Sequence, residues 1–550
     1  MRSARSRQPG AGSTVALLLL TFMGAVGIQA QDGRTPDRGP NEGEGPFDRL
    51  IIRGALVIDG SGAPPSGPTD IVIEGNRIVE VRAVGYPGVP IDPSRRPGGA
   101  TREIDAHGQF VLPGFIDLHV HAGGPSQKVP NPTYSYKLWL AHGVTTVRGV
   151  ALGEGDLVWA LEEKARSARN EIVAPRIYNC AKNPDRVAGW DDPDLMDPES
   201  ARRWVRFVHD MGADCLKLGR YAAGMMDPPV MEAILDEART LGLGSTAHLH
   251  QPGVARMNAL DMARLGLVGT THFYGLFESM YRENRVQPFP MGYNYQDEQH
   301  RFGQVGPQWR LIHEQGSDGW NALLDEFLER DFFLNPTLTI YEASRDVMRN
   351  RNADWMHEFA LPSMLDFYQP GREAHGSYWF YWTTKDEVEW RNFYQRWMAF
   401  LNDYKNRGGK VTTGSDSGFI YNLYGFGYIR ELELLQEAGF HPLEVIQAAT
   451  LHASEELFHA SGESPPFGLI RPGLLADLVI VEEDPLANFK ILYGTGAVRL
   501  NDDTGDVERV SSIRYTIKDG IVYDSKQLLQ DVRDMVEAQR MERLAAGGDR

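Results

Sequence analysis

The sequence predicts an α/β protein in which a (β/α)8 barrel of the TIM type is joined to a small β domain that is discontinuous in the chain. Three observations lead to this fold class. The chain has 550 residues, more than one ordinary core accommodates. From about Pro113, short apolar β-branched runs alternate with amphipathic segments, as in folds with parallel strands. Further strand-like runs lie before and after this region.

The barrel is predicted to span residues 113–464. Its strand candidates, in order, are FIDLHVH, GVTTVRGV, PRIYNC, DCLKLG, GSTAHLH, VGTTHFY, FFLNPTLTI and KVTTGSDSG. Eight parallel strands are the number that closes a barrel of this type. The stretches before and after FFLNPTLTI are long, so we expect extra helices or lids there. Residues 341–400 are rich in aromatic side chains, and two interpretations stay open: a wall for substrate side chains, or an addition that packs its aromatics internally.

The small β domain is expected in two parts, residues 47–112 and 465–525, because short apolar runs separated by turn residues occur in both. The last part of the chain, residues 526–550, reads as a charged helix. Residues 31–46 are polar and rich in Gly and Pro, which is typical of a linker.

Residues 1–30 have the pattern of a signal peptide. Arg2, Arg5 and Arg7 precede an apolar run, and Ile28-Gln29-Ala30 offers a small-residue cleavage site. The run is shorter than the roughly 20 apolar residues of a membrane span, although an uncleaved anchor is the alternative. We expect an exported protein, periplasmic or secreted, with no stable membrane span after processing.

Composition limits the partners. The formal net charge of −18 argues against a nucleic-acid partner, which would need a basic face. We expect a small-molecule substrate, and the sequence leaves a homo-oligomer open.

Cys180 and Cys215 lie in short apolar stretches and have no metal-site or redox spacing. Two buried free thiols are expected, although an exported protein could oxidise them.

His119 and His121 are the first candidate metal ligands. They lie two residues apart near the end of the first barrel strand, so their side chains point to the same face. Catalytic residues of such barrels come from the carboxyl ends of the strands, where two imidazoles suit a catalytic metal. A lone His-x-His is weak evidence, but its place in a series of eight strands strengthens it.

Later strand candidates end in similar groups. His248 and His250 lie in TAHLHQPG, His272 lies in VGTTHFY, and Asp416 lies in VTTGSDSG. A carboxylate there can bind a metal and accept a proton from metal-bound water. The alternatives are core histidines and an aspartate that caps the next helix. Their recurrence at equivalent places in one barrel favours a shared site.

Lys217 lies between Leu216 and Leu218 in the fourth strand candidate. Lysine is almost never fully buried unless it is paired. One interpretation is a modified lysine that bridges two metals, and the other is a structural ion pair with a carboxylate of the barrel.

Taken together, PGFIDLHVH, Lys217, AHLHQPG, His272, GSDSG and GLIRPGLLADLVIVEEDPL resemble the metal-dependent amidohydrolase superfamily. The resemblance covers roughly residues 50 to 525 and is greatest to the imidazolonepropionase-like branch that includes Xaa-Pro dipeptidases. It implies a β-sandwich beside the barrel and a pair of divalent zinc ions bridged by a carboxylated Lys217. Thr271 departs from the family, which often has a glutamate before the sixth-strand histidine.

The resemblance also implies roles for the candidate residues. His119 and His121 would bind the more buried metal with Asp416, while His248 and His272 would bind the second. Asp416 would be the general base and later proton donor. Asp117 and His250 would support the ligands or orient the substrate.

We therefore expect hydrolysis of an amide bond, most simply in a dipeptide or N-acyl amino acid, by a metal-activated hydroxide. An esterase, lactonase or deaminase on the same site is the alternative among enzymes, and a binding protein without catalysis is the alternative outside them. The exact substrate, the metal identity and the oligomeric state are not fixed by the sequence.

Overall fold

The computed structural model describes residues 34–547 apart from 123–127, 183, 185, 186, 193, 220–226, 250, 255, 285–288, 372–380 and 511. The predicted signal peptide, residues 1–30, lies outside the described residues, as do His250 and the first residues of the predicted linker. Within the described part of the chain, no helix is long and apolar enough to cross a membrane.

The main sheet contains eight strands that follow one another in chain order, and every neighbouring pair is parallel. This confirms the mixed α/β architecture, and each strand overlaps one of the eight predicted runs. The strands are β6 (Phe115–Val120), β7 (Val144–Gly149), β8 (Arg176–Ala181), β9 (Cys215–Leu218), β10 (Gly244–Ala247), β11 (Gly269–Thr271), β12 (Phe333–Asn335) and β13 (Lys410–Val411).

The two ends of this curled sheet are joined by backbone hydrogen bonds. Leu118 N, in β6, donates to Thr413 O at 3.0 Å, and Asp416 N donates to His119 O at 2.9 Å. The chain that leaves β13 therefore runs beside β6, which brings the first and the last predicted ligand positions together.

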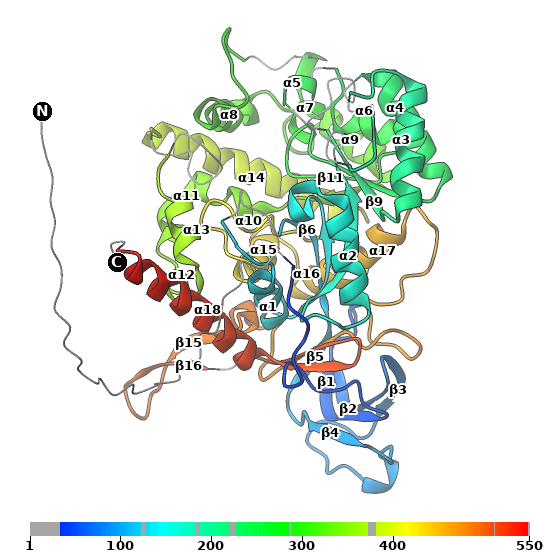
Figure 1. The fold of residues 1–550 in the computed structure, drawn as a ribbon, viewed down its shortest axis with the longest axis vertical. Coiled ribbons are helices and arrows are strands. Elements are labelled where there is room, and N and C mark those ends of the chain that lie inside the picture. The colour runs from blue at the N-terminus through cyan, green and yellow to red at the C-terminus, as the bar shows by residue number, and fades with distance from the viewer. Residues whose placement is uncertain are drawn as a thin grey trace, which may run out of the picture. The chain divides into compact units, whose positions relative to one another are not determined.

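Helices follow most of the strands, and several begin at an aspartate whose side chain accepts backbone N–H groups, as Asp156 and Asp197 do. Those between the strands up to β11, and those after β13, are α1 (Thr133–Ala141), α2 (Leu157–Ala168), α3 (Pro198–Met211), α4 (Pro228–Thr240), α5 (Gln251–Val254), α6 (Ala259–Arg264), α15 (Phe426–Glu437), α16 (Pro442–Gln447) and α17 (Ala453–Phe458). Figure 1 shows helices around the strands of the parallel sheet and β1 to β4 away from them.

The long stretches on both sides of β12 contain additional helices, as expected. Between β11 and β12 lie α7 (Leu276–Ser279), α8 (Glu298–Val305) and α9 (Asp318–Leu328); between β12 and β13 lie α10 (Leu338–Tyr341), α11 (Ala343–Arg351), α12 (Met356–Phe359), α13 (Pro362–Phe367) and α14 (Thr384–Asn406). The end of the predicted strand run FFLNPTLTI is thus helical. In α14, Trp390 and Trp397 are buried and pack edge-on against Phe273.

A second, mostly antiparallel sheet draws strands from both ends of the chain, in the order β18-β17-β14-β5-β1-β2-β3, with β4 paired to β1. Its core contains Ile52, Ile71 and Ile480. These strands form one sheet, so the two-sheet sandwich stays a prediction. The bounds are β1 (Leu50–Val57), β2 (Ser66–Glu74), β3 (Arg77–Ala83), β4 (Arg102–Asp105), β5 (Phe110–Pro113), β14 (Leu478–Val481), β17 (Ile513–Lys518) and β18 (Ile521–Asp524).

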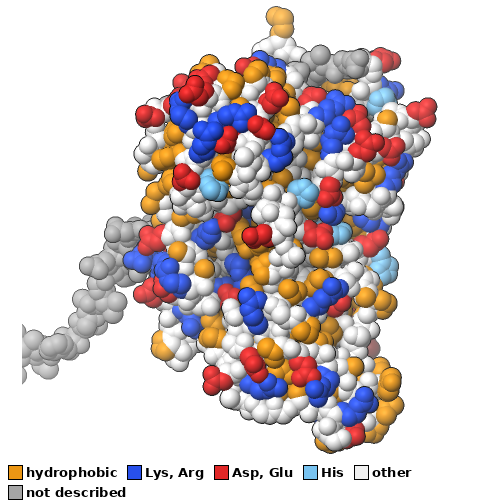
Figure 2. All heavy atoms as spheres, turned by 90° about the vertical axis from the view of Figure 1, so that its right-hand side faces the viewer, with side chains coloured by type: hydrophobic (Ala, Val, Ile, Leu, Met, Phe, Trp, Pro, Cys, Tyr) orange, Lys and Arg blue, Asp and Glu red, His pale blue; other side chains and the backbone are white. Residues whose placement is uncertain are grey.

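The remaining elements are a hairpin of β15 (Ala497–Leu500) and β16 (Val507–Val510), and the C-terminal helix α18 (Ser525–Ala545). Acidic and basic side chains are interspersed on the face seen in Figure 2.

The expectation of two free thiols is wrong. Cys180 of β8 and Cys215 of β9 form a disulfide, with 4.2 Å between their Cα atoms. The two residues lie opposite each other in the parallel register of β8 and β9. A separation of 35 residues gave no hint of this, because only the sheet register brings the two side chains together.

Candidate metal centre

His119 and His121 lie at the carboxyl end of β6 with their rings 5.4 Å apart, as the alternation of the strand predicts. The buried carboxylate of Asp117 supports this end of β6. It accepts hydrogen bonds from the backbone of His119 (3.2 Å) and from the backbone and hydroxyl of Ser415 (2.9 and 2.5 Å). Asp117 therefore fixes the histidine strand to the turn that carries Asp416.

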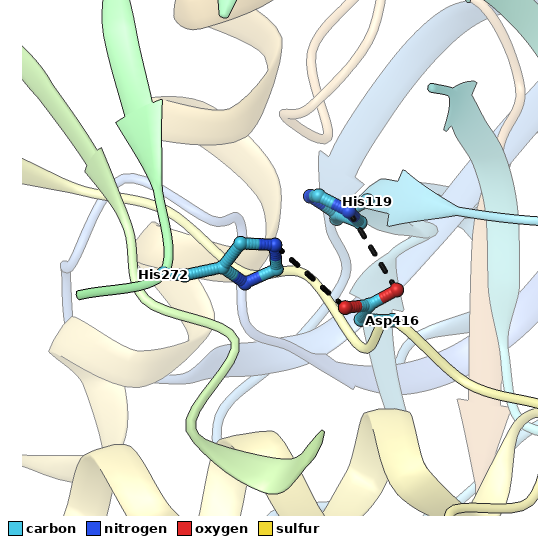
Figure 3. A group of neighbouring side chains, drawn as sticks. All are labelled: His119, His272 and Asp416. Atoms are coloured by element: carbon cyan, nitrogen blue, oxygen red, sulfur yellow. Dashed lines mark ion pairs between the residues drawn. The ribbon is translucent and has the colours of Figure 1, made fainter. Parts of the chain in front are cut away.

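Asp416 is the centre of the cluster (Figure 3). Its carboxylate lies 3.1 Å from Nε2 of His121, 3.6 Å from Nε2 of His119 and 3.7 Å from Nε2 of His272. Burial opposes ionisation, but the hydrogen bond with His121 and the electrostatic effects of His121, His272 and Lys217 outweigh it and lower the pKa of Asp416 to about 2. Asp416 is thus an anion at neutral pH.

The backbone contributes to this convergence. His272 follows directly after the end of β11, and Asp416 lies in the loop that follows β13; their φ values are 67° and 49°. Such left-handed conformations are uncommon for residues other than glycine and cluster at functional sites. Here they turn both side chains out of the strand direction and toward each other.

The hydrogen bonds of His272 fix its tautomer. The Thr337 hydroxyl donates to the carbonyl of Pro336 at 2.6 Å, and His272 Nδ1 lies 2.6 Å from the same hydroxyl oxygen. Since that hydroxyl has one hydrogen, His272 Nδ1 is the donor, and Nε2 keeps its lone pair. Burial also lowers the pKa of His272 to about 3, so the ring is neutral.

The arrangement fits a divalent cation. Donor atoms of His119, His272 and Asp416 all lie within 4.8 Å of one another. A lone pair of His272 that faces a carboxylate is unfavourable unless a cation lies between them, and neutral imidazoles with a carboxylate form a common zinc ligand set. Burial also lowers the pKa of His119 well below its ordinary value.

Lys217 lies on the same side of the site. It is buried on β9, and its amine donates to the Thr271 hydroxyl at 3.1 Å. Its charge contributes to lowering the pKa of both His119 and Asp416, which places it beside them. Thr271, the departure from the family pattern, is thus the residue that contacts the candidate bridging lysine.

His248 lies next to His272, with 4.7 Å between the ring centroids, and its ring is stacked on Tyr274 at 4.5 Å. The structure therefore gathers His119, His121, Lys217, His248, His272 and Asp416 at one end of the parallel sheet. His250 lies outside the described residues, so its predicted role stays a prediction.

Several residues of the site escaped sequence reasoning. Tyr274 could have been found, since it follows His272 at the i+2 spacing. Tyr341 contacts the ring of His272 edge-on at 5.5 Å, and its hydroxyl is hydrogen-bonded to Tyr274. Tyr295 and Arg301 come from the long stretch between β11 and β12. Tyr341 begins the aromatic stretch 341–400, for which a wall beside the substrate was one of the two interpretations; no sequence signal pointed to Tyr295 or Arg301, because only folding brings them to the site.

Part of the chain is similar to known amidohydrolases. Residues 110–261 match the amidohydrolase family. A dihydroorotase from Anaeromyxobacter dehalogenans is 29% identical over 230 residues, 40% of this chain and 47% of that protein. An N-acyl-D-aspartate deacylase from Alcaligenes xylosoxydans xylosoxydans is 36% identical over 99 residues, 18% of this chain and 16% of that protein. These matches span about half or less of the length of the curated relatives.

A solved structure of a Xaa-Pro dipeptidase with bound methionine in the active site shares the fold. Its TM-score is 0.56 at 18% identity, over 86% of this chain and 100% of that one. The resemblance that the motifs predicted is confirmed for residues 110–261, which match the amidohydrolase family.

Proposed function

We propose that this protein is a metal-dependent hydrolase that cleaves a carbon–nitrogen amide bond in a small substrate. The observation that carries the proposal is the convergence of His119, His272 and Asp416 within 4.8 Å at one end of a parallel sheet. Catalytic residues of (β/α)8 barrels lie at this end, and we propose that the eight strands act as such a barrel.

The ligand set is proposed to be His119, His121, Lys217, His248, His272 and Asp416, with two divalent ions, proposed to be zinc. Such an ion supplies water with a pKa lowered from about 15.7 to roughly 7 and polarises a carbonyl oxygen. Lys217 is proposed to carry a carboxylate, because an ammonium ion would repel the cations.

Asp416 is the residue best placed to move the proton. It is ionised and adjacent to three imidazoles, so it can accept a proton from water and later give it to the departing nitrogen. Tyr341 and Tyr274 form an aromatic boundary against His272 and His248, which limits water around the reacting carbonyl. His250 is proposed to orient the substrate.

A dipeptide or an N-acyl amino acid is the proposed substrate class. Two similar proteins support this proposal: a Xaa-Pro dipeptidase of the same fold, and an N-acyl-D-aspartate deacylase that matches one segment of the chain. Each of these two proteins is named for the hydrolysis of an amide that joins an acyl group to an amino acid.

The test is a substrate panel with zinc-loaded protein: dipeptides, N-acyl amino acids, and matched esters and lactones. We expect turnover of amides and, for Asp416→Asn, a loss of at least about 100-fold, the lower end of acid–base contributions. His357→Asn replaces an exposed histidine of α12 and serves as the control. Turnover of esters or lactones alone would contradict the amidohydrolase activity, and an unaffected Asp416→Asn variant would contradict the site.

A further inference from the structure

Arg301 is a buried cation at the catalytic end of the sheet. It lies on α8, in the stretch that leaves the carboxyl end of β11 directly after His272, and it is 3% exposed. Charged side chains are rarely buried to this extent unless they are paired or functional. A guanidinium ion in this place therefore needs a physical explanation.

The surroundings of Arg301 are aromatic on two sides. Its guanidinium carbon lies 4.7 Å from the ring centroid of Tyr295 and 4.5 Å from that of Phe302. A guanidinium that packs against aromatic rings through its face makes its hydrogen bonds through the N–H groups in its plane. On its own helix, Glu298 Oε1 lies 2.9 Å from Nη2.

Tyr295 connects this cation to the metal centre. Its hydroxyl lies 3.2 Å from Nε2 of His248, so Arg301 is one tyrosine side chain away from a candidate ligand. The positive charge of Arg301 is also one of the causes that lower the pKa of His272. Although burial opposes its charge, Tyr274, Tyr295 and Glu298 raise the pKa of Arg301, which keeps it a cation.

We propose that Arg301 binds the free α-carboxylate of the substrate and so restricts the enzyme to substrates that end in a carboxylic acid. The inference rests on the proposed function, which puts the scissile amide at the metal centre. Guanidinium matches a carboxylate with two parallel hydrogen bonds, and low-dielectric surroundings strengthen the attraction. A carboxylate on the amino-acid side of the amide lies a few bonds from the reacting carbonyl. Arg301 is separated from the candidate metal ligand His248 by the side chain of Tyr295, which is consistent with that spacing.

The competing explanation is structural: Arg301 and Glu298 would only stabilise α8 against the barrel. The two explanations differ in what they predict for substrates with and without a carboxylate. The experiment therefore compares an N-acyl amino acid with its carboxamide, using zinc-loaded full-length protein, and measures kcat and KM separately.

For Arg301→Met we expect KM for the acid to rise roughly 10- to 100-fold, as when a charge-assisted hydrogen bond is lost, with a smaller change in kcat. Kinetics with the carboxamide should change little, so the preference for the acid disappears. Arg301→Lys keeps the charge but not the planar fork and should lie between the two. Arg310→Met is the matched control, because Arg310 lies in the same stretch, is exposed and pairs with Glu389.

Glu298→Gln is expected to change KM for the acid in the opposite direction. It removes the anion that competes with the substrate for Arg301, so KM for the acid should fall. A purely structural pair predicts instead that Glu298→Gln and Arg301→Met both lower the melting temperature and affect both substrates alike.

The outcomes separate the inference from the proposed function. If the protein hydrolyses acid and carboxamide equally well, and Arg301→Met or Arg301→Lys leaves that ratio unchanged, the carboxylate role is wrong while the hydrolase stands. If neither substrate nor any other amide is turned over, the proposed function itself fails. If Arg301→Met does not fold, the ratio of acid to carboxamide hydrolysis by Arg301→Lys decides whether Arg301 binds the carboxylate.

Discussion

Lys217 is a buried lysine whose proposed modification would reverse the charge of its side chain. Its amine is buried beside His119, His272 and Asp416 and donates to Thr271. A carboxylated amine would replace the positive charge with two oxygen donors that can span metals about 3.5–4 Å apart. The alternative is an unmodified lysine beside a single metal.

We expect the saturated protein to hold two metal ions per chain. Lys217→Ala should lose at least one ion and most activity, measured by metal analysis and turnover. A small carboxylic acid added to this variant should restore part of the turnover by occupying the vacated place. One ion per chain under saturating zinc, or a fully active Lys217→Ala, would falsify the bridge and leave the hydrolase assignment standing.

Asp70 in β2 is a second residue with a clear energetic role, far from the metal centre in sequence. Its buried carboxylate accepts hydrogen bonds from Arg96 (2.8 and 2.9 Å), from Arg53 (3.0 Å) and from the backbone of Gly54 (2.8 Å). Burial alone would raise the pKa of Asp70, but these hydrogen bonds outweigh it and the pKa is lowered.

Asp70→Asn should lower the free energy of unfolding by about 2 kcal/mol at pH 7, the scale of hydrogen bonds to a charged group. Because the folded-state pKa is depressed, this stabilisation is fully present above the ordinary value of 3.8 and is lost as the pH falls through the folded-state pKa. Urea unfolding at several pH values measures it. Glu103→Gln, which removes an exposed partner of Arg53, should cost less than about 1 kcal/mol. A difference that persists undiminished at low pH would contradict the assignment.

At the level of strands and helices, the disulfide joins β8 to β9, the strand that carries Lys217. Cys215 lies two residues before Lys217 on β9, so both side chains point to the same side of the strand. The cross-link between β8 and β9 therefore restrains the strand that presents Lys217.

Replacing Cys180 and Cys215 together with alanine should lower the free energy of unfolding by about 2–4 kcal/mol, the range expected for a disulfide that closes a loop of this order. Thiol titration of the unreduced, denatured protein is the direct check and should find no reactive thiol. Two titratable thiols would instead support the original expectation of free cysteines.

The aromatic stretch around α14 also belongs to this scale. Trp390 and Trp397 are buried and pack against Phe273 and Tyr341, which favours internal packing for these two side chains. Tyr341 contacts His272 as well, so one end of the cluster borders the metal centre. The role of residues 341–400 in substrate choice stays a prediction, and Trp379 lies outside the described residues.

At the scale of the whole molecule, we propose that the protein is exported. The Arg-rich start, the apolar run and Ile28-Gln29-Ala30 support the proposal, and a disulfide is typical of oxidising compartments. Protein isolated from the native cell envelope or medium should begin near Gln31 on N-terminal sequencing. Cytoplasmic protein that retains Met1 would contradict export.

The sequence by itself determined the alternation of strands and helices, and with it the parallel sheet. It also placed His119, His121, His248, His272 and Asp416 at strand ends, because spacing two residues apart and position after an apolar run are local properties. Lys217 was recognisable since a charged residue interrupts an apolar strand.

Only the tertiary structure decided the features that depend on register and on long connections. The pairing of Cys180 with Cys215 follows from the alignment of β8 with β9, which no local pattern encodes. Tyr341, Tyr295 and Arg301 reach the site from the long stretches around β12, and the final direction of each depends on packing. The left-handed turns at His272 and Asp416, likewise, are imposed by the surrounding fold, because their backbone conformation is unfavourable without it.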